Sequence, residues 1–323
     1  MNENSKKWKS RLLSSSIPLE FEVAKILSKL GFSVSYDYAF LRKEGTDFKE
    51  FSTDIHAVGF YPLKNDDKVE AIFDMLVECK YREEGKRWLF LPETNREGFS
   101  VQTLGCTIRH SATFTQRRIK KDKIYSQEEM FEFVLKGVEV NSNSGDVFDK
   151  DIRHGIHQLK YAMPYIIQDH IESNLYCHIE DAKPWFSVPI LLTNADLCIL
   201  HKNTSIDSIK KSEKIDDISQ IVPYLICYSD IGPEFTEHHK YIFKNFYTDN
   251  IKNENLQLFE AAQKKFLHKN YNIYDSPLEE CWELQSSFKS KLIHNYSHFF
   301  VCTFEHFEDL TRKILSTISK SMK

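Results

Sequence analysis

The chain has 323 residues, with 43 Lys and Arg against 47 Asp and Glu, so its formal net charge is −4. Its hydrophobic fraction of 41% is typical of a folded globular protein and argues against a disordered chain. No apolar run approaches the roughly 18 residues of a membrane-spanning helix, and the N-terminus lacks the apolar core of a secretory signal. The sequence therefore predicts a cytoplasmic protein without a membrane partner, and its bulk charge argues against non-specific coating of nucleic acid.

Hydrophobic spacing in the first quarter of the chain predicts one helix followed by three strands. Apolar residues at helical spacing, with Ser16 before them and Gly31 after them, favour a helix over 17–30. Strict alternation of apolar and polar residues then predicts strands over 32–40, 50–60 and 71–81. The connections between these strands are too short for parallel crossovers, so we expect antiparallel pairing here.

The remainder of the chain predicts further strands and helices. They are a strand over 86–92, a helix after Ser126 with a Ser126–Glu129 capping box, a helix over 149–172, buried strands over 188–194 and 221–229, helices near 253–269 and 277–293, a strand over 298–302 and a final helix from Phe304. The predicted class is α/β with a mixed sheet. We expect one domain over 1–232, with its core in 17–82 and 149–230 and an insertion over 83–148. A mainly helical C-terminal extension over 233–323 follows and can pack on the same domain.

Sequence motifs exclude two common kinds of site. Glycine is scarce at 10 residues, and neither GxGxxG nor GxxxxGK[ST] occurs, so a glycine-rich phosphate loop has no support. The seven cysteines are scattered and form no CxxC pair, which favours reduced thiols over a disulfide framework or a zinc site.

Polar side chains on two neighbouring strands form the most informative pattern. Glu78 and Lys80 are two positions apart and therefore project from the same face of their strand. Asp54 lies on the polar face of the preceding strand, so it can share one divalent ion with Glu78 if these strands are neighbours. Glu20, in the first turn of the helix 17–30, can add a carboxylate from the side. Mg²⁺ prefers such oxygen ligands, and a nearby lysine can stabilise charge on a phosphate.

These residues resemble the E…(P)D…(D/E)xK motif of the PD-(D/E)xK, or restriction-endonuclease-like, nuclease superfamily. The helix PLEFEVAKILSKLGFSV and the strand MLVECKY resemble those of Mrr-like members, and the similarity covers mainly residues 17–82. Thr53 stands where the motif has proline. The resemblance implies a restriction-endonuclease-like mixed sheet flanked by helices and a Mg²⁺-dependent endonuclease acting on DNA, with Mn²⁺ as a substitute ion. It also implies a homodimer, because double-strand cutting needs two sites.

Individual roles follow from the resemblance for five residues. Asp54, Glu78 and the backbone carbonyl of Cys79 would be metal ligands, Lys80 the catalytic lysine and Glu20 an auxiliary carboxylate. The competing interpretation of Asp54, Glu78 and Lys80 is a salt bridge on the sheet surface. A catalytically idle protein of the same fold, which binds nucleic acid or a partner protein, is the alternative from another functional class.

Residues around this set are candidates for supporting contacts. His56 shares the face of Asp54 and is interpreted as either a substrate contact or a surface histidine. Gln158 begins a QLKY stretch that only loosely resembles the QxxxY motif of RecB-like nucleases, because its spacing is one residue short. The cations expected to contact nucleic acid are Arg82, Arg117, Arg118, Lys120 and Lys121. Such runs usually keep a surface solvated, and beside a nuclease site they are candidates for phosphate contacts.

Overall fold

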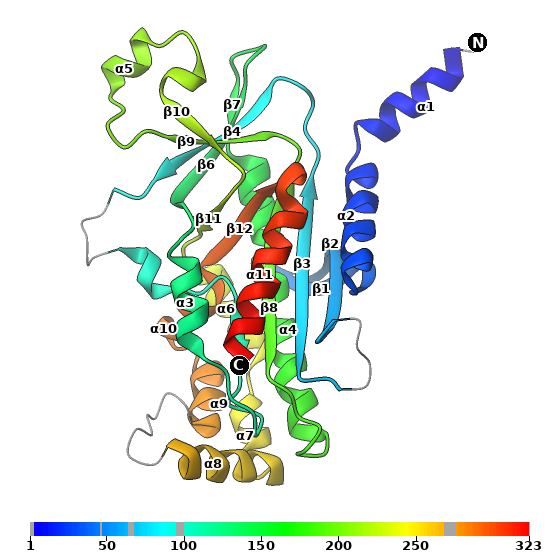
Figure 1. Cartoon of the computed structure of the whole chain (residues 1–323), viewed down its shortest axis with the longest axis vertical. Coiled ribbons are helices and arrows are strands. Elements are labelled where there is room, and N and C mark those ends of the chain that lie inside the picture. Colours follow the sequence, from blue (N-terminus) through cyan, green and yellow to red (C-terminus); the bar gives the residue numbers. More distant parts are fainter. Residues whose placement is uncertain (1–2, 46, 64–67, 95–99, 268–275, 323) are drawn as a thin grey trace.

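The computed structural model describes residues 3–45, 47–63, 68–94, 100–267 and 276–322. These residues form a mixed sheet with helices on both faces (Figure 1). The strands are β1 (Ser33–Glu44), β2 (Asp47–Tyr61), β3 (Ala71–Lys80), β4 (Lys86–Pro92), β5 (Arg109–Ser111), β6 (Phe133–Asn141), β7 (Val147–Phe148), β8 (Trp185–Thr193), β9 (Asp196–Leu200), β10 (Ser219–Val222), β11 (Tyr224–Tyr228) and β12 (His298–Thr303). The helices are α1 (Glu3–Leu13), α2 (Ile17–Leu30), α3 (Lys121–Glu128), α4 (Lys150–Tyr176), α5 (Ile206–Lys211), α6 (Pro233–Ile242), α7 (Phe246–Asn250), α8 (Glu254–Leu267), α9 (Pro277–Ser286), α10 (Lys289–Tyr296) and α11 (Phe307–Met322).

The strand order is β1-β2-β3-β8-β12-β11-β6-β4-β9-β10, with β5 paired to β8 and β7 to β6. The first three strands pair antiparallel. The central strand β8 runs parallel to both of its neighbours, β3 and β12. The predicted mixed α/β sheet is therefore confirmed. Strands from the expected insertion (β4, β6) and from the expected C-terminal extension (β12) belong to this same sheet, with β12 between β8 and β11.

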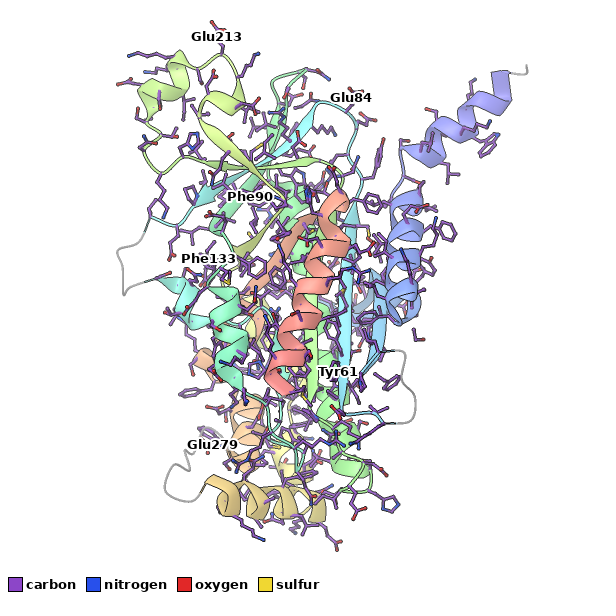
Figure 2. All side chains as sticks on the ribbon, in the orientation of Figure 1. Tyr61, Glu84, Phe90, Phe133, Glu213 and Glu279 are labelled. Atoms are coloured by element: carbon purple, nitrogen blue, oxygen red, sulfur yellow. The ribbon has the colours of Figure 1, made fainter. Side chains whose placement is uncertain are left out.

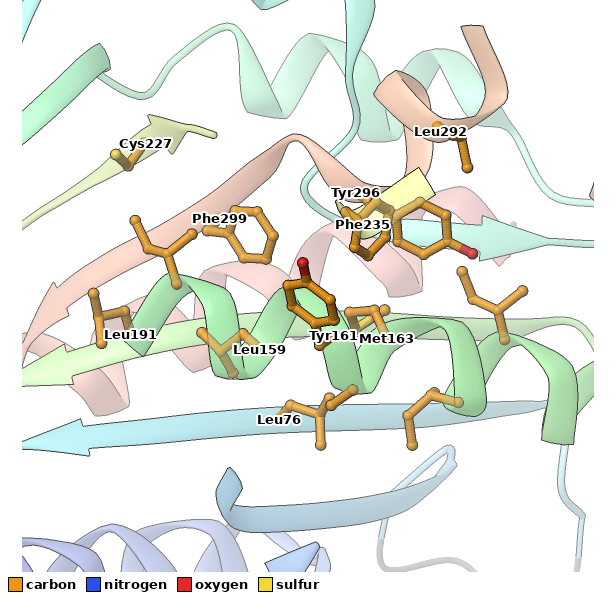
Figure 3. Packing of buried hydrophobic residues seen from close by; sticks show 14 of the residues in the cluster. Leu76, Leu159, Tyr161, Met163, Leu191, Cys227, Phe235, Leu292, Tyr296 and Phe299 are labelled. Atoms are coloured by element: carbon orange, nitrogen blue, oxygen red, sulfur yellow. The ribbon is translucent and has the colours of Figure 1, made fainter. Parts of the chain in front are cut away.

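Two hydrophobic clusters cover the two faces of the sheet. On one face, α4 and the helices α6 to α10 pack against the strands, through residues such as Leu76, Leu159 and Leu191 (Figure 3). On the other face, α2, α3 and α11 supply residues such as Leu27, Ile124 and Ile314. Period-2 side-chain alternation explains why successive residues of β3 enter different clusters: Leu76 faces α4, and its neighbours face α2 and α11.

Several predicted elements are confirmed and others are wrong. The helix 17–30 is α2, and Gly31 ends it in the left-handed region at φ 104°. The helix expected after Ser126 instead spans Lys121–Glu128, and the Ser126 hydroxyl donates to the Lys123 carbonyl rather than capping a helix. The strand expected over 221–229 is two strands separated by Pro223, which cannot donate a backbone hydrogen bond.

The C-terminal third differs from its predicted pattern at one break. The helix expected over 277–293 is two helices, because Ser287 adopts a left-handed conformation at φ 50° and ends α9. The end predicted for the preceding helix at residue 269 lies outside the described residues. Among the described helices, none has the length and apolar character needed to cross a membrane.

Candidate active site

The C-terminal end of β3 lies beside the middle of β2 and brings the Glu78–Lys80 segment to Asp54. The last paired residues are Ile55 with Val77, so one further step in register sets Asp54 opposite Glu78. Instead of extending the ladder, the Cys79 N–H donates to Asp54 Oδ2 over 2.6 Å. The N–H and C=O of one strand residue face the same neighbouring strand, so the Cys79 carbonyl also faces the side on which Asp54 lies.

Glu78 and Lys80 form a buried pair on the face of the sheet that α4 covers. Glu78 has no exposed side-chain surface, whereas 18% of the Lys80 side chain is exposed. Lys80 Nζ lies 2.5 Å from Glu78 Oε1. The other oxygen, Glu78 Oε2, is buried and has no hydrogen-bond partner among the described residues. An unsatisfied buried carboxylate oxygen is costly, so a cation or a proton at this atom would stabilise it.

Helix α4 fixes the position of Lys80. Gln158 accepts from Lys80 Nζ through Oε1 at 3.3 Å and donates from Nε2 to the Ser52 carbonyl at 2.9 Å. The amide therefore bridges the lysine and strand β2. One turn earlier, Gly155 lies so close to the sheet that a Cβ there would be 3.3 Å from Lys80 Cε and 3.4 Å from Glu78 Cγ. Glycine at this position allows the helix to cover the site closely.

Two further carboxyl groups lie near Asp54. Glu20, in the first turn of α2, and Asp37, in β1, both interact electrostatically with Asp54. Asp37 lies between the paired residues Tyr36 and Tyr38, opposite Asp54, and adopts a left-handed conformation at φ 55°. Glu22, the other glutamate of α2, instead pairs with Lys25 at 2.6 Å on the exposed side of the helix.

Burial and mutual repulsion raise the pKa values of Glu20, Asp54 and Glu78. The pKa of Glu78 rises to about 8, because burial first and the charge of Asp54 second outweigh the opposing effect of Lys80. Burial also raises the pKa of Glu20 to about 7, with smaller contributions from Asp54 and Asp37. Burial likewise raises the pKa of Asp54, although the hydrogen bond from the Cys79 N–H partly offsets this rise. A site that holds several such groups against one ammonium favours an additional cation.

The residues fit a divalent ion held by two carboxylates. Mg²⁺ commonly takes one or two protein carboxylates and completes its coordination with water and substrate phosphate. Asp54 and Glu78, with the Cys79 carbonyl beside them, supply such a set, and no described residue competes for Glu78 Oε2. Within the described ranges, no group of three or more His, Cys, Asp or Glu side chains is arranged to hold a metal ion. A site built here would therefore depend on two carboxylates and not on a larger cluster.

His56 lies in a different cluster from Asp54. Its Nε2 is 2.5 Å from Asp74 Oδ1, and His170 Nε2 contacts the other oxygen of the same carboxylate. Asp74 is 4% exposed, and its pKa falls to about 2: burial raises it, but the two imidazoles, His170 first, lower it by more. Tyr38 stacks edge-on against His56. His56 therefore pairs with Asp74 and lies two residues after Asp54 in β2.

The predicted cation Arg82 is committed to internal ion pairs. It contacts the buried Glu139 and lies 3.0 Å from Asp151, and only 11% of its side chain is exposed. Lys86 also pairs with Glu139, at 3.3 Å. Arg82 therefore stabilises the connection after β3 and is poorly placed as a free phosphate contact.

The basic run from Arg117 to Lys121, including Arg118 and Lys120, lies at the opposite end of β3. Arg117 donates to the Glu70 carbonyl just before this strand begins, over 3.0 Å. Glu78 is eight residues further along, or roughly 26 Å at the usual rise per strand residue. Figure 2 shows the two ends of the strand, marked by Tyr61, which pairs with Ala71, and by Glu84, which follows Lys80. These cations are therefore not beside Lys80.

Two residues of the site were not found from the sequence. Asp37 occupies a polar position of an alternating strand pattern, between two tyrosines, and aspartate is a poor strand residue, which is the available signal. Gly155 lies inside an otherwise regular helical pattern, where an interior glycine often marks close packing.

Comparison with known proteins does not relate this site to any other protein. No family model, no curated protein and no solved structure matches the chain.

Proposed function

We propose that this chain is a divalent-metal-dependent nuclease that hydrolyses phosphodiester bonds, with DNA as its substrate. The observation that carries the proposal is the fully buried Glu78 Oε2, which no described residue partners, beside Lys80 and at the point where Asp54 joins β2 to β3. Burying a carboxylate and a lysine together at a strand end is expensive unless they serve a site. DNA as the substrate rests on the resemblance of residues 17–82 to Mrr-like nucleases.

Asp54 and Glu78 would hold Mg²⁺ or Mn²⁺, with the Cys79 carbonyl as a third ligand. When bound, the ion supplies charge neutralisation at the phosphate and an activated water. Lys80 would donate to a phosphate oxygen, and its positive charge would stabilise the negative charge that develops there. Gln158 keeps the ammonium near Glu78, so Lys80 needs little reorientation when a substrate binds. Glu20 can position a water from the open side of the site.

A cleavage assay on the purified full chain tests this proposal. Supercoiled plasmid, linear duplex, single-stranded DNA and RNA are incubated with Mg²⁺ or Mn²⁺, with and without EDTA. We expect metal-dependent cleavage of DNA that Asp54→Asn, Glu78→Gln and Lys80→Met each reduce more than about 100-fold, the scale of losing one transition-state charge contact. Lys49→Ala is the matched control, because Lys49 is an exposed residue of β2 that pairs with Glu44.

The outcomes separate the proposal from its alternative. Cleavage that survives both Asp54→Asn and Lys80→Met would show that the site lies elsewhere. DNA binding without cleavage on any substrate would instead support a catalytically idle protein of this fold. RNA cleavage in place of DNA cleavage would correct the substrate and leave the site unchanged.

A further inference from the structure

Helix α1 stands clear of the sheet, beyond the start of α2 (Figure 1). Residues 7–14 are all exposed. A short bend joins the two helices, in which the N–H groups of Ser14 and Ser15 donate to the carbonyls of Ser10 and Leu12 over 3.0 and 3.1 Å. No extended linker therefore separates α1 from α2, and the exposed part of α1 buries none of its side chains in the fold.

The junction of α1 with α2 lies near the candidate active site. Glu20 is in the first turn of α2 and interacts electrostatically with Asp54 and Lys80. Arg11 precedes Glu20 by nine residues, or roughly 14 Å at the usual helical rise. Along duplex DNA this distance corresponds to about four base pairs. A duplex with one phosphate at Lys80 would therefore pass within reach of α1.

The cations of α1 are free to meet a partner. Lys7, Lys9 and Arg11 are exposed and form no ion pair with any described residue. Lys7 and Arg11 are four positions apart, so they share one face of the helix. Lys9 Nζ lies over the Trp8 ring, 5.7 Å from its centroid. The exposed part of α1 thus carries three positive charges within two turns and no carboxylate.

Two cations of the sheet are, by contrast, already paired. Arg42 of β1 lies 2.6 Å from Glu234 of α6. Arg82 contacts the buried Glu139. These side chains would have to break internal ion pairs before they could contact a phosphate, whereas those of α1 would not.

Exposed apolar side chains on α1 and α2 are too few for a stable protein interface. At roughly 150–250 Å² for a fully exposed large side chain, the set presents about 500 Å². A stable interface buries about 800 Å² on each partner, and a patch of the smaller size is ordinary on a monomer. The residues, between 39% and 63% exposed, are Trp8, Leu12, Leu13, Ile17 and Phe21.

We propose that α1 binds the phosphate backbone of duplex DNA beside the candidate active site, through Lys7, Lys9 and Arg11. Duplex DNA carries one negative charge for about every 1.7 Å of its axis, so a short basic helix meets several phosphates. Such contacts give affinity and position the duplex without reading its sequence. The choice of DNA rests on the proposed nuclease function. α1 supplies the substrate-holding surface that Arg82 and the Arg117–Lys121 run are poorly placed to provide.

Fluorescence anisotropy of a short labelled duplex tests this inference on the full chain, in EDTA so that the duplex stays intact. The α1 variant, Lys7→Ala/Lys9→Ala/Arg11→Ala, should bind at least tenfold more weakly than wild type. Its slope of log Kobs against log [salt] should be shallower by about 2 to 3, at about 0.9 for each phosphate contact. All three residues are exposed and alanine favours helices, so the fold should be retained.

A matched control removes the same charge at the other end of the molecule. It replaces three exposed lysines around α7 and α8, far from α1 in Figure 1, with alanine and should bind duplex as wild type does. These lysines are Lys244, Lys252 and Lys265. Equal affinity and an equal salt slope for wild type and the α1 variant would refute the inference.

Cleavage kinetics separate this inference from the proposed function. With Mg²⁺, the α1 variant should raise KM at least tenfold and leave kcat unchanged, because its lost contacts hold the substrate equally in the ground and transition states. Binding through α1 without cleavage by wild type would refute the nuclease function and retain this inference. Cleavage with an unchanged KM in the α1 variant would refute this inference and retain the nuclease function.

Two other partners of α1 would also overturn the proposal. A dimer in sedimentation velocity that Trp8→Ala and Leu13→Ala dissociate would assign α1 to a second copy of the chain. Binding of phosphatidylserine vesicles, without binding of duplex DNA, would assign it to a membrane surface.

Discussion

Replacing Gly155 with alanine should destabilise the protein, although alanine favours helices. The new Cβ would lie 2.5 Å from Leu191 Cδ1, in addition to its contacts with Lys80 and Glu78. Leu191 is fully buried in β8, so it can move only by displacing its neighbours. Overpacking of this kind costs roughly 1–3 kcal/mol. The gain from glycine to alanine inside a helix is about 1 kcal/mol, which leaves a net loss of roughly 1 kcal/mol.

A double-mutant cycle checks this reasoning. Leu191→Ala removes the atom that the new Cβ would meet, at its own cost of roughly 2–5 kcal/mol. In that background Gly155→Ala should stabilise the protein by about 1 kcal/mol. Only the higher helix propensity of alanine and the partial filling of the cavity left by Leu191→Ala then contribute. Urea unfolding of the four proteins gives the free energies of unfolding. An equal effect of Gly155→Ala in both backgrounds would refute close packing of α4 on Leu191.

Two further predictions concern Asp74 and Gln158. The folded-state pKa of Asp74, about 2, is below the ordinary 3.8, so its contribution is present above about pH 4 and is lost as the pH falls towards 2. Between pH 6 and 2, wild type should lose about 2 kcal/mol more unfolding free energy than Asp74→Asn, and equal losses would contradict the ion pairs. Gln158→Leu should lower the kcat of DNA cleavage roughly tenfold with little change in KM, because Lys80 loses an anchor. Gln168→Leu, on the same helix, is its control, and a loss confined to KM would argue against this positioning role.

Local patterns predicted the elements well, whereas the arrangement of the sheet required contacts between distant segments. Alternation over 71–81 and the Ser16–Gly31 boundaries are properties of neighbouring residues, so β3 and α2 appear where expected. The place of β12 between β8 and β11 depends on Val301 meeting Leu191 and Leu225, which both lie far earlier in the chain. No local period encodes that choice, and the C-terminal segment was therefore predicted as an extension.

The candidate site divides in the same way. Strand periodicity placed Glu78 and Lys80 on one face, and the register of β2 with β3 brings Asp54 to them. Periodicity also places His56 on the face of Asp54. It does not show that the His56 imidazole pairs with Asp74, which lies two positions before Leu76. The distance of the Arg117–Lys121 run from the site follows from the path of the chain, which charge clustering alone does not report.

Titration of Mn²⁺ into the metal-free protein tests most directly whether Asp54 and Glu78 share one divalent ion. The proposed site predicts one binding event that Asp54→Asn and Glu78→Gln each weaken at least tenfold. Asp207→Asn, at an exposed residue of α5, should leave that event unchanged. Absence of binding at millimolar Mn²⁺, or an affinity that neither Asp54→Asn nor Glu78→Gln alters, would contradict a metal site between the middle of β2 and the end of β3.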